Sequence, residues 1–409
     1  MSNREDARLA TQDQRTRTTA ATRMAGFVSA LEYSQLPLEV VHAAKLHALD
    51  TVGVGIAAAV LPGEGLSARA SVSVFTEMGG AGESTVIGQA TRIPAANAAF
   101  ANAALDHSLD FDDNHTASRV HVSTMIVPAA LAVGEKVGAS GREVIAALVA
   151  GNEIATRIGM GGPRHFQAHG FHGTPVCGVF GATASAALLM RLDEVLTAHA
   201  FGLAGDTATG INAWVAEGTT NKHLHPGWAT HSGVLSAQLA AKGAEGPPAV
   251  FEGRFGIYEP LTDAKNVDLE PVLSSMGEVW ETPRMAFKPY PACHFMHASI
   301  DSAAEIRESV IDSLNELESI DVIVPSAAVP IVLEPRETRI RPISCYAGKF
   351  SLQYSVAAML LRGRIDLMTY TPEAMGDERI LALAARINWV VSEAFDAGSQ
   401  VYPGGIRVR

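Results

Sequence analysis

Cysteine, aromatic residues and positive charge are all scarce in this sequence, and each shortage removes a class of protein. The three cysteines among 409 residues, Cys177, Cys293 and Cys345, lie far apart and form no CxxC spacing. That usage argues against a disulfide framework or a zinc site and predicts a protein of the reducing cytoplasm. Aromatic residues make up only 6% of the chain, whereas alanine and glycine abound. This composition favours closely packed helices with small side chains at their crossings.

Basic residues are outnumbered, with 31 Lys and Arg against 43 Asp and Glu, and the formal net charge is −12. Because no basic stripe could neutralise phosphates, we expect no nucleic-acid partner. No uncharged apolar run reaches the ~20 residues that span a bilayer, so we expect no membrane segment. P-loop, strand-borne GxGxxG and GxSxG motifs are also missing. Nucleotide-dependent and serine-hydrolase chemistry therefore have no support.

Apolar residues recur at helical spacing over most of the chain up to about residue 280. Helices are expected over residues 18–31, 38–59, 94–106, 124–137, 141–158, 179–192, 197–210 and 230–242. Residues 1–17 are polar and Arg-rich without an apolar core, which predicts a flexible tail rather than a signal peptide.

The composition changes near residues 280–289, beyond which strands and helices are mixed. The β-branched runs 320–324 and 329–333 predict strands, and we expect helices over 297–309, 350–361 and 377–394. These features predict a mainly α fold, with a large all-helical domain followed by a smaller α+β domain. A cleft between two such domains is the natural place for a ligand.

The segment from Ser108 to His115 concentrates acidic residues between two nearly uncharged runs. Carboxylates so close to core-forming sequence are costly unless they are paired, hydrogen-bonded or used in chemistry. A solvated loop tip between two helices would show the same letters. Asp112-Asp113 resembles the aspartate-rich motif of prenyl synthases, but the third aspartate is missing and no second magnesium triad follows. We therefore expect no metal.

Histidines gather in the middle of the chain, in regions that lack acids. Ten of the fourteen histidines lie between His107 and His231, and residues 154–192 and 218–244 contain neither Asp nor Glu. Cationic islands of this kind inside an acidic protein suggest a pocket for an anion.

Three short segments carry the candidate basic groups. His172 lies near a predicted helix N-terminus, which suits an anionic ligand and lowers the pKa of an imidazole; a capping histidine is the alternative. Lys222 and His225 share a turn that could hold a carboxylate, or that could be a solvated loop. Prolines after Lys288 give His294 a rigid presentation, although a histidine pair in that segment could also fit a metal.

These residues lie in a longer series of segments: Leu49–Gly53, Asp106–Asp113, Gly170–His172, Asn221–His225, Phe251–Gly253, Lys288–Pro291 and Lys349–Tyr354. The series follows the order found in the MmgE/PrpD family of cofactor-independent lyases and isomerases, which the chain resembles over nearly its whole length. Members include 2-methylcitrate dehydratase, cis-aconitate decarboxylase and iminodisuccinate epimerase.

The resemblance implies an all-helical domain over residues 18–282, an α+β lid domain over 283–409, a homodimer and no cofactor. The chain stops at Arg409, short of the C-terminal segment that in the family returns to the helical domain, so we expect a shortened lid. The family's catalytic positions map onto Asp110, His121, His172, Lys222 and His294. We expect Asn114, His225, Lys288 and Tyr354 to bind substrate.

Two departures from the family pattern are visible around the acidic run. Decarboxylase-like members have a threonine where this chain has Asn114. The spacing from Asp110 to His121 is also one residue longer than in the family.

The resemblance and the basic groups lead to a hypothesis of a lyase acting on a small di- or tricarboxylic acid. Lys222 would hold a substrate carboxylate, and His172 or His294 would remove a proton next to it. The acid would be another histidine, or Asp110 if burial raised the pKa of its carboxyl. An epimerase, in which two bases exchange one proton, is the first alternative. A non-catalytic carboxylate-binding protein is the second.

Overall fold

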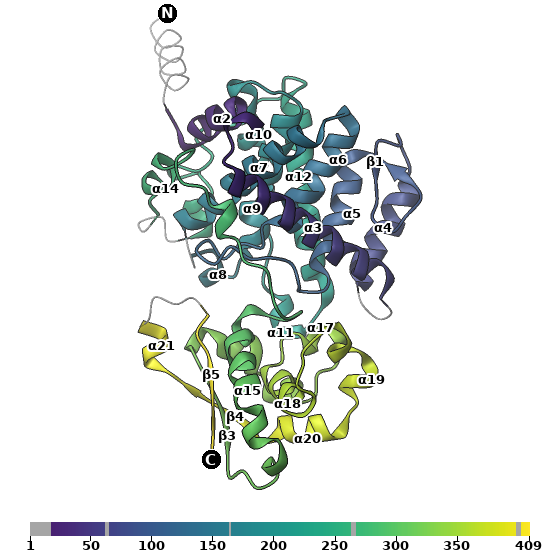
Figure 1. Cartoon of the computed structure of the whole chain (residues 1–409). Helices are drawn as coiled ribbons and strands as arrows, with labels where there is room; N and C mark the ends of the chain where they lie inside the picture. The colour runs from purple at the N-terminus through teal and green to yellow at the C-terminus, as the bar shows by residue number, and fades with distance from the viewer. Residues whose placement is uncertain (1–17, 62–64, 163–164, 263–266, 398–401) are drawn as a thin grey trace, which may run out of the picture.

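The protein is described here by a computed structural model of residues 18–61, 65–162, 165–262, 267–397 and 402–409. The predicted tail, residues 1–17, lies outside the described residues. Two bodies are visible in Figure 1, a larger helical one and a smaller one of helices and strands. The prediction of a mainly α fold with a smaller α+β domain is confirmed.

The larger body is an array of helices: α2 (Ala20–Ala30), α3 (Leu38–Val60), α4 (Leu66–Met78), α5 (Ala95–His107), α6 (Ser123–Val137), α7 (Gly141–Gly161), α9 (Gly173–Leu189), α10 (Glu194–Gly205) and α12 (Leu224–Ala240). Helix α9 lies in the middle and packs against α6, α7, α10 and α12. The small residues expected at helix crossings are found there. A Cβ atom on Gly181 would lie 2.7 Å from the Gly151 carbonyl oxygen, so α9 and α7 approach as closely as they do because both residues are glycine.

Short elements connect these helices: β1 (Ser84–Thr85), β2 (Arg92–Ile93), α8 (His165–Ala168), α11 (Trp214–Glu217), η2 (Thr220–His223), α13 (Tyr258–Leu261), α14 (Glu270–Ser274) and η4 (Thr282–Arg284). By length and composition alone, α3 could cross a membrane. In the structure it packs against α5, α6 and α7 and buries His47.

The smaller body is built on a three-stranded sheet in the order β4-β3-β5. Strand β3 (Ile320–Val324) pairs in parallel with β4 (Ile387–Val391) and antiparallel with β5 (Gly405–Val408). Its helices include α15 (His297–Val310), α16 (Arg336–Ile340), α17 (Cys345–Gly348), α18 (Leu352–Arg362), α19 (Pro372–Met375), α20 (Glu378–Arg386) and α21 (Glu393–Ala397).

Two expectations for this domain are wrong. The run 329–333 is a single π-helical turn, η8 (Val329–Leu333), and not a strand, because a proline at position 330 cannot donate to a sheet ladder. The helix expected over 377–394 ends at Arg386, where the β-branched residues that follow pair with β3.

The two bodies have separate cores that meet at an interleaved seam. The core of the helical body extends to Met285, and the lid core begins at Ala292. Trp214 of α11 nevertheless packs in the lid core. The predicted domain limits of 18–282 and 283–409 remain a prediction.

The segment that joins the two bodies, residues 279–291, is called the linker. A buried ion pair anchors it from the helical side. Glu153 and Arg157, four residues apart on α7, pair with each other while both side chains are about 1% exposed. The Glu153 carboxylate also accepts hydrogen bonds from the backbone N–H groups of Glu281 and Thr282, and Arg157 donates to the Val279 carbonyl. The pair therefore fixes the start of the linker.

Candidate active site

A cavity of about 550 Å³ lies between the two domains. Seven of the nine predicted site residues line it: Asp110, Asn114, His121, His172, Lys222, Lys288 and His294. The first five come from the helical domain, Lys288 comes from the linker and His294 comes from the 3-10 turn η5 (His294–Met296) of the lid. Residues distant in the sequence thus meet in one hollow.

Asp110 is the centre of the charged part of this cavity. Its carboxylate accepts hydrogen bonds from the Lys222 ammonium at 2.5 Å and from the Lys288 ammonium at 3.0 Å. Lys288 also donates to the Asp110 carbonyl oxygen at 2.7 Å. The backbone of Asp110 has φ +50°, in the left-handed region, where aspartate is tolerated better than most residues. That conformation allows carbonyl and carboxylate to meet the same ammonium.

The charge state of Asp110 differs from our expectation. Burial acts to raise the pKa of this carboxyl, but the Lys222 and Lys288 ammoniums outweigh it and hold the pKa well below its usual range. Burial likewise acts to lower the pKa of Lys288, but Asp110, Asp112 and Cys293 together more than offset that effect, so the net direction is upward. Asp110 is therefore ionised at neutral pH, so the condition under which it could act as the general acid, a pKa raised by burial, is not met.

The lining as a whole carries an excess of positive charge. Among the described residues around the cavity, the two ammoniums of Lys222 and Lys288 share a single carboxylate, that of Asp110. One ammonium is balanced by this carboxylate. The remaining charge favours an anionic ligand.

His172 occupies the N-cap position of α9, near the helix N-terminus as expected from the sequence, but its side chain makes no capping hydrogen bond. Its Nδ1 lies 3.1 Å from Nδ1 of His225, so one ring must donate and the other accept. Burial, followed by His225 and Lys222, lowers the pKa of His172 well below its usual value. Burial and Lys222 lower the pKa of His225 to about 4. Both rings are neutral near pH 7, and burial, rather than the helix terminus, is the main cause.

A histidine–carboxylate cluster supports the same wall. Asp112, which is fully buried, lies 2.7 Å from Nδ1 of His107 and 3.2 Å from Nδ1 of His121. Burial lowers the pKa of His107 to about 4, with a further contribution from Lys222 that the nearby Asp112 opposes. The three ligand atoms lie within 4.8 Å of one another, a spacing that a divalent metal could also use. The Nδ1–H of the neutral His107 ring donates to Asp112, and Nδ1 of His121 also lies 3.1 Å from the Asp113 carbonyl oxygen, so these atoms have partners within the protein.

A second acidic group lies deeper in the helical domain. Asp106 is fully buried, and neither of its carboxyl oxygens has a hydrogen-bond partner among the described residues. Burial, and after it the charges of Asp112 and Asp50, raise its pKa well above the usual range. Nearby, Asp113 pairs with His47 at 2.7 Å.

The lid contributes an aromatic pair to the cavity. The His294 ring stacks on Tyr402, with centroids 4.4 Å apart and an interplanar angle of 13°. Burial, then His297 and Lys288, lower the pKa of His294 to about 3. Cys293 next to it is buried, and burial together with Asp110 raises the pKa of its thiol to about 11. His294 is thus a neutral imidazole beside an unreactive thiol.

Two predicted substrate-binding residues do not line the cavity. His225 lies behind His172 and reaches the site only through that ring. Tyr354 is fully buried in the lid core, where its hydroxyl donates to the Thr369 carbonyl at 2.8 Å. The expected substrate contact of Tyr354 is wrong because its hydroxyl already has a partner inside the domain.

Asn114 lies where a ligand could use its side chain. Its backbone pairs with Ala286 of the linker, at 3.0 and 2.9 Å. Its side-chain Oδ1 is buried without a hydrogen-bond partner among the described residues. The backbone is therefore fixed while the amide remains available.

Sequence reasoning did not find several residues that line the cavity: Arg119, Gln167, Ala168, Asn212, Trp214, Val215, Phe295, Ala327, Pro330, Ile331, Phe350 and Tyr402. Most are apolar or amide side chains, which carry no chemical signature of their own. Asn212 and Trp214 lie between His172 and Lys222 in the sequence. That position between two predicted site residues is the signal from which they could have been found.

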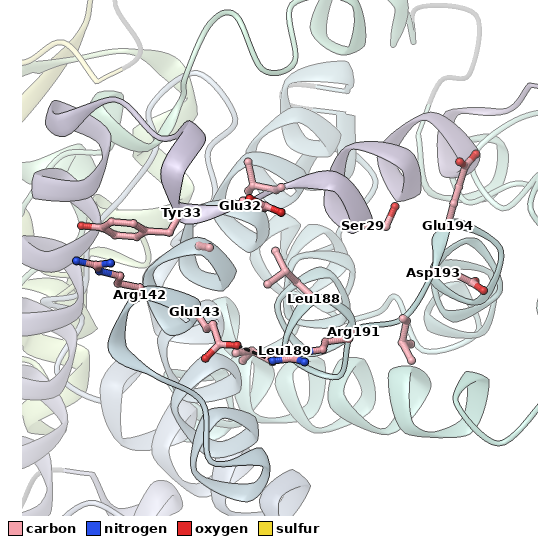
Figure 2. A pocket seen from close by; sticks show the side chains of 13 residues that line it. Ser29, Glu32, Tyr33, Arg142, Glu143, Leu188, Leu189, Arg191, Asp193 and Glu194 are labelled. Carbon is pink, nitrogen blue, oxygen red and sulfur yellow. Dashed lines mark hydrogen bonds and ion pairs between the residues drawn. The ribbon is translucent and has the colours of Figure 1, made fainter.

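A second hollow, of about 590 Å³, lies in the helical domain between the end of α2, the start of α7 and the turn from α9 to α10 (Figure 2). Its two arginines have partners: Arg191 donates to Glu143 at 3.1 Å, and the Arg142 guanidinium lies over the Tyr33 ring. None of the described residues that line it is a histidine or a lysine. This hollow offers no set of convergent acid–base groups.

Fold and site together define a two-domain, mainly helical protein with a cationic, histidine-lined cavity at the domain seam. The sequence profile of the MmgE/PrpD N-terminal domain matches residues 22–270, and that of the MmgE/PrpD C-terminal domain matches residues 290–408. The chain belongs to the MmgE/PrpD family.

Several characterised proteins are similar to it over most of its length. A cis-aconitate decarboxylase-like protein, oryM, of Aspergillus oryzae is 27% identical over 91% of this chain and 80% of its own. The cis-aconitate decarboxylase of Aspergillus terreus is 25% identical over 93% of this chain and 80% of its own. The human cis-aconitate decarboxylase is 28% identical over 84% of this chain and 70% of its own. Relatives of this kind support a lyase-type enzyme.

Proposed function

We propose that this protein is a lyase that acts on a small di- or tricarboxylic acid by proton transfer next to a carboxylate, without a metal or organic cofactor. The observation that carries the proposal is the excess of cations around Asp110 in a cavity that also contains three histidines. Among lyase reactions, decarboxylation of an acid like cis-aconitate is favoured by the names of the relatives.

In this proposal Lys222, Lys288 and Arg119 hold the substrate carboxylates. Ammonium groups act as compact point charges, whereas a guanidinium can bind a carboxylate with two parallel hydrogen bonds. Asp110 keeps the two ammoniums in place before the substrate arrives. Charge that develops next to the reacting carboxylate is stabilised by these fixed cations.

His172 is the proton-transfer group that we assign on the helical side. When its Nδ1–H donates to His225, the Nε2 lone pair is free and the ring is a base; in the opposite arrangement Nε2 carries the proton and the ring is an acid. His225 is a positioning residue in either case. His294, supplied by the facing domain, is the second proton-transfer group. For decarboxylation, the carbon–carbon bond breaks with release of carbon dioxide, and the resulting carbanion takes the N–H proton of one neutral imidazole, which solvent then restores to that ring.

A screen of citrate, 2-methylcitrate, cis-aconitate and iminodisuccinate by mass spectrometry tests this proposal. Loss of water or carbon dioxide is expected from at least one acid, and Lys222→Ala should abolish most of that turnover. In heavy water, an epimerase would instead give a product that has gained deuterium and inverted its configuration without losing water or carbon dioxide. The same two histidines would serve that reaction. Ligand-induced stabilisation without any turnover would identify a non-catalytic binding protein.

We also propose a cytoplasmic homodimer without nucleic-acid or membrane partners. The absence of a basic stripe and the sparse cysteines support this proposal. Light scattering coupled to size-exclusion chromatography tests the oligomeric state.

A further inference from the structure

One half of the seam cavity is not used by the proton chemistry. Its lining is apolar and comes mainly from the lid, with two residues from α11: Trp214, Val215, Phe295, Ala327, Ile331 and Phe350. The charged and histidine side chains are among the remaining lining residues. A cavity divided in this way fits a ligand with an anionic end and a hydrocarbon end.

The apolar wall begins next to the cation that binds carboxylate. The Lys222 ammonium nitrogen lies 5.3 Å from the centre of the Trp214 ring and 5.1 Å from that of Phe350. The two rings pack edge to face with centroids 5.2 Å apart. A ligand carboxylate at Lys222 therefore has hydrocarbon surface within a few bond lengths.

The wall then leads outward. Trp214 and Phe350 are 7% and 5% exposed, Ile331 is half-buried, and Ala327 and Pro330 are exposed at the outer end. This gradient describes an apolar passage from the cationic centre toward solvent. The η8 turn, which the sequence suggested would be a strand, provides its far side.

An unsubstituted tricarboxylic acid matches only part of this cavity. Its branches all end in charged groups, so it has no surface to place against the rings. The volume of about 550 Å³ lies within the ~300–1,000 Å³ of sites that hold drug-sized ligands, whereas a six-carbon acid is considerably smaller. Leaving the apolar half in contact with water would forgo its contribution to binding.

We propose that the acid accepted by this site carries a hydrocarbon substituent of several carbons close to one carboxylate. The carboxylate binds at Lys222 and Lys288, and the substituent lies along Trp214, Phe350 and Ile331. The inference rests on the proposed function for the anionic end of the ligand, and it deepens that function by naming the substrate class.

Isothermal titration with succinate, butylsuccinate and hexylsuccinate tests the inference without requiring turnover. Each buried methylene should tighten binding about fourfold, so butylsuccinate should bind on the order of a hundredfold more tightly than succinate. Ile331→Asp should reduce the ratio of butylsuccinate to succinate affinity at least ~10-fold by the same reasoning. Using the ratio cancels the repulsion that a new carboxylate exerts on every dianion.

Matched variants guard against unspecific effects. Ile343, on the lid and 72% exposed, does not line the cavity, so Ile343→Asp should leave the affinity ratio at its wild-type value. Ala327 is exposed, so Ala327→Asp introduces a charge into the wall without burying it and should lower the ratio even if Ile331→Asp fails to fold.

Equal affinities for succinate and butylsuccinate would overturn the inference while leaving the lyase proposal intact. An equal fall of the ratio in Ile343→Asp and Ile331→Asp would also overturn it. Absence of binding by every member of the series would overturn both, because the anion site itself would then be wrong.

Discussion

Replacing Asp110 by asparagine tests the organisation of the charged site most directly. The carboxylate is 1% exposed and neutralises ammoniums from two separate segments, at 2.5 and 3.0 Å. An amide of the same shape would leave Lys222 and Lys288 buried beside a neutral partner. Removing one member of a buried ion pair costs about 3–5 kcal/mol. Because two cations share this carboxylate, we expect Asp110→Asn to lower the free energy of unfolding at pH 7 by about 3 kcal/mol or more.

Urea denaturation followed by circular dichroism measures this loss, with Glu270→Gln as the control. Glu270 pairs with Arg23 at 2.6 Å, but its side chain is 68% exposed, and exposed pairs contribute only about 0–1 kcal/mol. If Asp110→Asn changes the free energy of unfolding by no more than the control does, the buried triad has no stabilising role and our account of the site is incorrect.

The pH dependence of the same difference provides an independent check. The native pKa of Asp110 is lowered, so its stabilisation is fully present above the unfolded value of ~3.9 and is lost as the pH falls toward the native value. The difference between wild type and Asp110→Asn should thus be constant from neutral pH down to about pH 5 and shrink below pH 4. Succinate should stabilise the variant more than the wild type, because its carboxylate replaces the missing one.

Three further predictions concern other parts of the site. His225→Phe removes the partner of His172 Nδ1. Turnover should fall at least ~10-fold, with a shifted pH profile of activity and little change in KM. A purely structural role of His225 would leave the pH profile of activity unchanged. Asp106 has a raised native pKa, so the wild type loses stability relative to Asp106→Asn as the pH rises above the unfolded pKa of ~3.9. In urea titrations the stability advantage of Asp106→Asn should grow from about pH 4 to neutral pH, and a constant difference would contradict the assignment. Dialysis against EDTA should leave turnover unchanged, and metal analysis should find less than one equivalent of metal. Activity that is lost on dialysis and restored only by added zinc would identify the cluster of His107, Asp112 and His121 as a metal centre.

The charged half of the site could be predicted because its chemistry is visible in single residues. A lysine or histidine in an acid-free segment, or an aspartate between two apolar helices, is costly to bury without a partner. The sequence therefore indicated that Asp110, His172, Lys222 and His294 converge. Family resemblance supplied the order of the segments, and the profile matches confirm that membership.

The apolar half could not be predicted in the same way. Trp214 and Ile331 are ordinary core residues by composition, and only the packing of α11 against the lid brings them to the cavity. The η8 turn was taken for a strand because β-branched residues favour strands, whereas Pro330 and the local packing decide otherwise. The ionised state of Asp110 depends on a distance to Lys288 that no local pattern contains.

The origin of each group separates ligand binding from proton transfer. Lys288 lies on the linker. The linker backbone at Ala286 pairs with the Asn114 backbone, and the Glu281 N–H donates to the Glu153 carboxylate. Lys222 and Lys288, to which our proposal assigns carboxylate binding, are thus both attached to the helical domain. His294 belongs to the lid, where the backbone N–H of the preceding residue donates to the Lys349 carbonyl at 2.9 Å. In the function that we propose, a displacement of the lid would remove His294 and the lid residues of the apolar wall while leaving the anion site assembled. Substrate selection by the hydrocarbon end and completion of the proton-transfer pair would then depend on the same domain contact.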